Sequence, residues 1–136
     1  MRRLYLVTKP ISFLSIYQKY HDLSTQSKKL VEKAKRAGVK IQEKSLSLEK
    51  ILSKTSENCI PIILLDWNIV RNKREKSYQG HFVPIVGYGP RNIYVHNHGL
   101  KNPRAFRSIP KKTFEKARKS QGTDEDILFV YRKTEN

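Results

Sequence analysis

The spacing of apolar residues along the chain predicts helices that alternate with strands. Between Ser24 and Gly38, the residues Leu30, Val31 and Ala34 recur at helical spacing, with Ser24 suited to the N-cap and Gly38 to the residue after the helix. Two more helices are expected, one capped by Ser47 and one in KKTFEKARKSQG, whereas the stretch ISFLSIYQKY suits either a helix or an extended arm. Strands are expected over residues 3–7, 39–41, 60–66, 81–88, 93–97 and 126–132.

Turn residues join two of these strands into a predicted hairpin. HFVPIVGY and IYVHN are separated by Gly89, Pro90, Arg91 and Asn92, which favour a tight reversal of the chain. The polar loop RNKREKSYQG leads into the hairpin. Antiparallel strands combined with helices predict an α+β fold, and residues 1–136 have the length of a single domain.

Composition limits the cellular compartments and the partners that we expect for the chain. The chain has 28 Lys and Arg against 12 Asp and Glu, a net charge of +16 that attracts polyanions and acidic surfaces. Its single cysteine, Cys59, excludes an intrachain disulfide and fits a reducing compartment. No apolar run approaches the ~20 residues that cross a bilayer, so no membrane association is expected. We therefore expect a cytoplasmic protein, and no residue pattern indicates a cofactor.

Two polar side chains lie at strand ends that the hairpin brings together. His81 opens the first strand and Asn97 closes the second, so the Asn97 amide is expected to reach the His81 imidazole. A histidine held by an amide is the general-base half of many hydrolytic sites. Asp66 and Trp67 end the buried strand nearby and are candidates for substrate binding, although strand-end capping and core packing are the simpler roles.

A metal site is the weaker interpretation of the histidines. His96 and His98 stand two apart on a predicted strand and, with Asp66, could hold a divalent ion. Alternation would send both histidines to the side opposite Asn97, where a structural role is more usual. No metal is therefore expected.

The strand motifs resemble a known family. GHFVPIVGYG followed by NIYVHNHG is similar to the histidine and acid/amide strands of the papain-like bacteriocin-processing, or double-glycine-leader, peptidases. The resemblance implies a papain-like half-domain with His81 as catalytic base and Asn97 as its orienting residue, where the family usually has aspartate and proline. It also implies that the segment carrying the nucleophilic cysteine is absent from the front of the chain. Cys59 lacks the surroundings that lower a thiol pKa, so a structural cysteine is the better interpretation.

The resemblance implies a cysteine-peptidase-like domain that is inactive alone. It also implies a peptide or protein as the substrate. The alternative is a non-catalytic basic module that binds nucleic acid or an acidic protein. Nucleic acid is a less favoured partner than a peptide or protein substrate. Because the absent segment would leave a sheet face uncovered, a homodimer or a second chain over that face is also expected.

Overall fold

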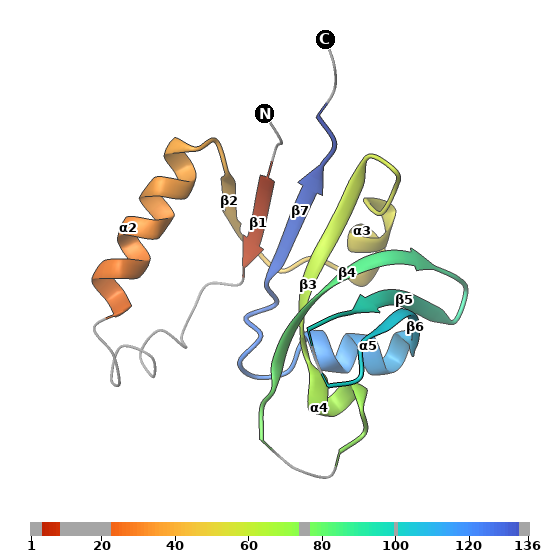
Figure 1. Cartoon of the computed structure of the whole chain (residues 1–136). Helices are drawn as coiled ribbons and strands as arrows, with labels where there is room; N and C mark the ends of the chain where they lie inside the picture. The colour runs from red at the N-terminus through yellow and green to blue at the C-terminus, as the bar shows by residue number, and fades with distance from the viewer. Residues whose placement is uncertain (1–3, 9–22, 74–76, 100, 134–136) are drawn as a thin grey trace.

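The computed structural model describes residues 4–8, 23–73, 77–99 and 101–133, and the undecided stretch 11–20 lies outside them. Its α+β class confirms the expected fold class (Figure 1). Among the described residues, no helix combines the length and the apolar character needed to cross a membrane. The elements in chain order are β1 (Leu4–Thr8), α2 (Leu23–Arg36), β2 (Lys40–Glu43), α3 (Leu48–Ser53), β3 (Cys59–Asp66), α4 (Trp67–Val70), β4 (Gly80–Tyr88), β5 (Asn92–Asn97), β6 (Arg104–Pro110), α5 (Lys111–Arg118) and β7 (Ile127–Tyr131).

All the strands join one sheet in the order β2-β1-β7-β3-β4-β5-β6. Neighbouring strands are antiparallel except β1 and β2, which are parallel and lie at one edge. The predicted hairpin is β4 and β5, with Ile85 opposite Val95 and Tyr88 opposite Ile93. The first and last strands are therefore neighbours, because β7 lies between β1 and β3.

Local capping explains the boundaries of the helices. The Ser47 hydroxyl accepts a hydrogen bond from the Lys50 N–H at 3.2 Å and so begins α3, as expected. Gly38, with φ of 83°, follows α2 in the left-handed conformation that glycine adopts at little cost. Asp66 caps α4, a single turn that apolar spacing could not reveal.

The strand β6 is the main element that the pattern did not predict. Pro103 precedes this strand and Pro110 ends it, and proline is a usual sign of a loop rather than a strand. Residue 110 ends the strand and precedes α5, so the proline stands where its missing N–H costs little.

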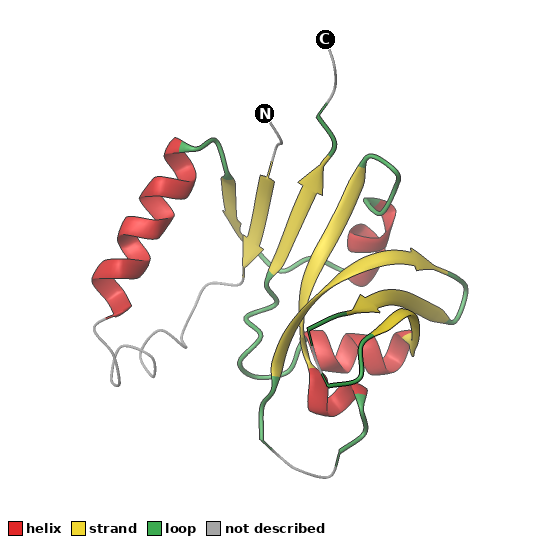
Figure 2. Cartoon of the chain, viewed as in Figure 1, coloured by secondary structure: helices red, strands yellow, loops and turns green. Residues whose placement is uncertain are grey.

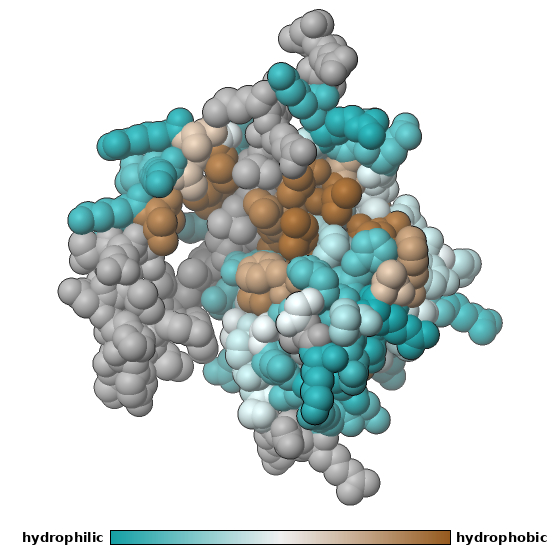
Figure 3. All heavy atoms as spheres, viewed as in Figure 1, coloured by the Kyte–Doolittle hydropathy of each residue, from teal (hydrophilic) through white to brown (hydrophobic). Residues whose placement is uncertain are grey.

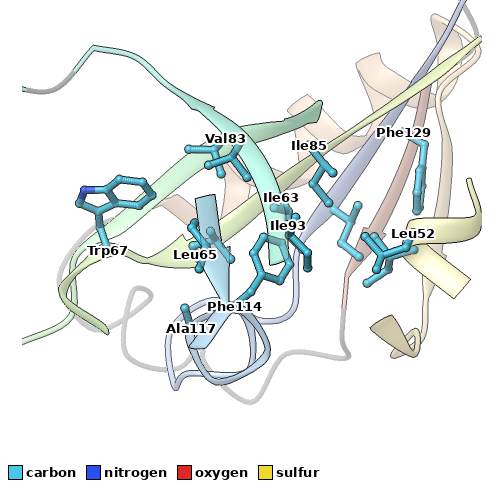
Figure 4. Close-up of a cluster of buried hydrophobic side chains, with 14 of the residues drawn as sticks. Leu52, Ile63, Leu65, Trp67, Val83, Ile85, Ile93, Phe114, Ala117 and Phe129 are labelled. Carbon is cyan, nitrogen blue, oxygen red and sulfur yellow. The ribbon is translucent and has the colours of Figure 1, made fainter. Parts of the chain in front are cut away.

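The core fills one face of the sheet. Alternate residues of the central strands point into it, among them Ile63, Val83, Ile85 and Ile93, all with no exposed surface. Figure 4 shows this core running from Leu52 and Phe129 at one end to Trp67 at the other. The buried cluster comprises Ile51, Leu52, Cys59, Ile63, Leu65, Trp67, Val83, Ile85, Ile93, Val95, Ile109, Phe114, Ala117, Ile127 and Phe129.

The opposite face of the sheet is the more exposed one among the residues that the structure describes. Phe82 is 45% exposed and Tyr94 36% exposed, whereas Val83, Ile93 and Val95 beside them have no exposed surface. Figure 2 shows α2 standing beyond β2, away from α3, α4 and α5, and Figure 3 shows hydrophobic side chains gathered on the viewed face over β3 and β7. That a second copy or another chain covers this face stays a prediction.

Buried polar contacts fix α5 against the rest of the fold. Arg118, fully buried, pairs with Glu115 at 2.6 Å and Glu125 at 3.3 Å and donates to the Leu46 carbonyl at 3.0 Å. Just beyond the helix, the Ser120 hydroxyl donates to a carboxylate oxygen of Asp66 at 2.9 Å. The segment that follows α5 therefore holds the end of β3 in place through Asp66.

Candidate functional site

His81 and Asn97 lie together where the hairpin strands meet the end of the core. His81 shares the core-facing side of β4 with Val83 and Ile85, and Asn97 shares that side of β5 with Val95. The His81 Nε2 and Asn97 Oδ1 atoms are 3.1 Å apart. The structure thus brings together the two side chains that the hairpin pattern predicted as a pair.

The hydrogen bonds of Asn97 define the tautomer of His81. Asn97 Nδ2 donates to the Asn102 carbonyl at 3.0 Å, which directs the amide oxygen toward the imidazole. Since that oxygen can only accept, Nε2 of neutral His81 must carry the proton and donate it. The lone pair then lies on Nδ1, which is the nitrogen able to take a proton from a bound molecule.

The surroundings of His81 favour its neutral form. Burial lowers the pKa of His81 below the ordinary value of 6.5, the hydrogen bond to Asn97 opposes this shift, and the charge of His98 adds to the lowering. The rings of His81 and His98 have centroids 5.7 Å apart. Near neutral pH the His81 imidazole is therefore mostly uncharged and can act as a base.

Trp67 forms the inner wall of the site. It is 1% exposed, and its ring meets the His81 ring edge-on, with centroids 5.0 Å apart and an interplanar angle of 81°. Its position follows from Asp66, whose Oδ1 accepts from the Asn68 N–H at 3.2 Å and from the Gln79 N–H at 3.3 Å. The carboxylate therefore caps α4 and ties down the approach to β4, and its role in substrate binding stays a prediction.

Arg107 is a site residue that the sequence pattern did not identify. It lies on β6 opposite Val95, and its guanidinium carbon is 5.3 Å from the centroid of the Trp67 ring. This is the range of a cation–π contact. The only signal in the sequence would have been the position of Arg107 two residues before the core residue Ile109, and that signal required the unpredicted strand.

The two other histidines of the hairpin take different sides. His96 faces away from the site, as alternation predicted, and its ring contacts Phe106 with centroids 4.6 Å apart. The prediction that His98 also faces away is wrong, because β5 ends at Asn97 and His98 lies beyond the strict alternation, with its ring beside His81. Within the described ranges, no three His, Cys, Asp or Glu side chains come together as metal ligands.

Cys59 lies far along β3 from this site and is a core residue. Its exposed fraction is 4%, and burial raises the pKa of its thiol above the ordinary value of 9.0, against the lowering effects of Tyr131 and Lys54. A raised thiol pKa leaves little thiolate near neutral pH. The structural interpretation of this cysteine agrees with its place in the core.

Comparison with known proteins relates the chain to nucleotide cyclases. The guanylylate cyclase family model matches residues 7–130. Guanylyl cyclase 1 of Arabidopsis thaliana is 32% identical over 118 residues, an alignment that covers 74% of this chain and 42% of that relative. The chain thus spans less than half the length of this curated relative. No solved structure matches the chain.

These matches overturn the functional interpretation of the strand motifs. The assignment to bacteriocin-processing peptidases is wrong, because the family model and the relative are those of guanylyl cyclases. The expected inactive peptidase with a peptide substrate is wrong for the same reason, and the alternative of a basic binding module is not supported either. A histidine and an amide at the ends of paired strands are compatible with more than one reaction.

Proposed function

Because the chain belongs to the guanylylate cyclase family, we propose that it binds guanosine triphosphate at the His81–Asn97 pair and takes part in its cyclisation. The printed name of the Arabidopsis thaliana relative supports the substrate and the reaction class. The observation that supports the assignment to this site is the contact of His81 Nε2 with Asn97 Oδ1 at 3.1 Å, which directs Nδ1 of the imidazole away from Asn97.

In the proposed step, His81 is the general base. The 3′-hydroxyl oxygen of the ribose attacks the α-phosphorus, and its proton passes to Nδ1 of His81. A new bond forms between the 3′-oxygen and the α-phosphorus, while the bond from that phosphorus to the oxygen bridging to the β-phosphate breaks. The products are the cyclic monophosphate and pyrophosphate. General-base assistance of this kind contributes about 10²- to 10⁴-fold to a rate.

The charge of the chain suits such a substrate. A net charge of +16 favours encounter with a triphosphate, which is strongly anionic at neutral pH. In the site itself, the carboxylate of Asp66 accepts three hydrogen bonds, from the backbone of Asn68 and Gln79 and from Ser120. Its negative charge is thereby partly balanced by donors, which lessens its repulsion of a phosphate group.

The function is tested by supplying the purified chain with GTP or ATP and magnesium and detecting cyclic nucleotides by mass spectrometry. We expect cyclic GMP to form from GTP, and the His81→Gln variant to lose about 10²- to 10⁴-fold in rate because the base is gone. Phe82→Gln, on the opposite side of the same strand, is the matched control and should keep its rate. Equal rates for the wild type and His81→Gln would refute the role of His81, and no cyclic GMP from the wild type would refute the function of this chain.

A cytoplasmic location is part of the same proposal. A reducing compartment suits a chain whose single cysteine is buried and unpaired with another. Fractionation of the producing cells, with the chain followed by antibody, would test this location.

A further inference from the structure

The strand β6 contains a bulge beside the candidate site. Val95 pairs with Arg107, yet Asn97 pairs with Arg104, so three steps along β6 match two steps along β5. One extra residue is therefore accommodated in β6, as in a β-bulge. Phe106, inside this segment, has φ of 51°, a left-handed conformation that is costly for a bulky side chain.

The bulge changes which residues of β6 face the side of the sheet that holds the site. Residues directly opposite each other on paired strands share one face of a sheet. Val95 and Asn97 both belong to the core-facing side of β5, so their partners Arg107 and Arg104 are both placed on that side. In a regular strand, residues three apart would point to opposite faces. The bulge therefore puts two guanidinium-bearing positions on the side where His81 lies.

His96 fixes the conformation of the bulge from the other side of the sheet. Its Nδ1 accepts a hydrogen bond from the Phe106 N–H at 3.1 Å, and its ring packs edge-on against the Phe106 ring at an interplanar angle of 80°. The extra residue of a bulge is left without a ladder partner, so an acceptor for its N–H offsets part of the cost. Both contacts hold Phe106 in its left-handed conformation.

Neither arginine forms an ion pair with a carboxylate within the part of the chain that the structure describes. The flat guanidinium of Arg107 lies by the Trp67 ring, which limits its side-chain freedom without occupying its N–H donors. A guanidinium in this state can donate two parallel hydrogen bonds to a phosphate, with little further loss of side-chain entropy.

We propose that Arg107, assisted by Arg104, binds the phosphate chain of the nucleotide, and that His96 is a positioning residue that maintains the bulge. The inference rests on the proposed function for the identity of the nucleotide. It also goes beyond that function, because it assigns a phosphate-binding role to two arginines of β6. Binding of a free inorganic polyphosphate to this site follows from it as well.

The fluorescence of Trp67 can report phosphate binding directly, since Trp67 is the single tryptophan of the chain. Inorganic triphosphate is titrated into the purified chain while Trp67 emission is followed, and the same titration is repeated with GTP. We expect triphosphate to alter the emission as Arg107 shifts, and Arg107→Gln to weaken triphosphate binding about 10- to 100-fold, the usual range for a lost charged hydrogen bond. Arg107→Lys should lose less, because it keeps the charge, and Arg104→Gln should lose less than Arg107→Gln.

Arg91→Gln is the matched control, because it removes the same charge from the turn at the opposite end of the β4–β5 hairpin. We expect it to bind triphosphate within twofold of the wild type. Equal weakening in Arg91→Gln and Arg107→Gln would overturn the proposal, because binding would then follow net charge alone. Triphosphate binding that depends on Arg107, in a chain that makes no cyclic GMP, would support this inference and refute the proposed function.

A pair of variants separates the positioning role of His96 from simple packing. His96→Asn keeps an acceptor near the place of Nδ1, whereas His96→Leu keeps bulk and removes the acceptor. We expect triphosphate affinity to fall in His96→Leu and to be largely retained in His96→Asn, with Trp67 emission changed only in the former. Wild-type affinity in His96→Leu would overturn the role given to His96.

Discussion

The two faces of the β3–β4–β5 segment are made by the same strands but differ in how far their side chains are exposed. On the face covered by α3, α4 and α5, side chains such as Val83 and Ile93 have no exposed surface. On the open face, Phe82 and Tyr94 remain substantially exposed. The site lies on the core-facing side of the strands. His81 and Asn97 continue the row of core-facing residues to the strand ends, and there polar side chains replace apolar ones.

Because of this continuation, core packing supports His81 although that residue is only partly buried. The imidazole of His81 lies against Trp67, a core residue, so its orientation is set by packing as well as by Asn97. Held in this way, a side chain loses little entropy when a substrate binds. The open face lacks such a support, and the residues on it are expected to tolerate substitution.

The largest contrast is expected in stability, between residues on the two sides of β4. Ile85→Ala removes a fully buried side chain and should lower the free energy of unfolding by about 2–5 kcal/mol. Phe82→Ala, on the other face, should cost less than about 1.5 kcal/mol, because its ring is already 45% exposed. Urea denaturation of both variants measures the difference. Similar losses would mean that the open face is covered in solution.

The next effect concerns catalysis. Asn97→Ala removes the group that orients the imidazole, and we expect the rate of cyclic GMP formation to fall about 10²-fold, as for a misplaced catalytic group. Tyr94→Ala, on the open face of the same strand, should keep its rate and serves as the control. An undiminished rate for Asn97→Ala would contradict the orienting role.

A smaller effect is expected on the open face itself. Phe82→Ser should cost less than about 1.5 kcal/mol of stability, because the ring is already 45% exposed and gives up only part of its burial. Sedimentation analysis of this variant and the wild type also bears on the predicted homodimer. If the wild type dimerises through this face, the polar substitution should weaken the dimer, whereas unchanged association would place the contact elsewhere.

The smallest effect is a shift in pH dependence. His98→Gln removes a charge that lowers the pKa of His81, so that pKa should rise toward 6.5 while burial still holds it lower. Because the base must be unprotonated, the acid side of the rate profile should move to higher pH in this variant. A shift to lower pH would show that His98 does not act on His81 through its charge.

Local patterns predicted much of the fold and the central pair of the site. The hairpin, the Ser47 cap and the meeting of His81 with Asn97 follow from alternation and turn chemistry, which act over a few residues. The bulge at Phe106 could not be predicted, because its left-handed conformation is fixed by a contact with His96 ten positions away. The place of Arg107 over Trp67 depends on that strand and was missed for the same reason.

The reaction was the least predictable property. Strand motifs around His81 and Asn97 describe how two polar side chains are delivered to a sheet end, and this arrangement does not specify what attacks or leaves. The comparison with guanylyl cyclases shows the family of the chain, and the reaction proposed for it rests on that family.

The most direct test of His81 as the base of this site is its protonation state, measured by nitrogen NMR on protein labelled with ¹⁵N in its histidine rings. Signals of His81 are assigned by comparison with the His81→Gln variant and followed through a pH titration. We predict a pKa below 6.5 and a neutral form protonated on Nε2, which leaves Nδ1 free to accept a proton. A pKa above 6.5, or a neutral form protonated on Nδ1, would contradict the claim that His81 is the base of this site.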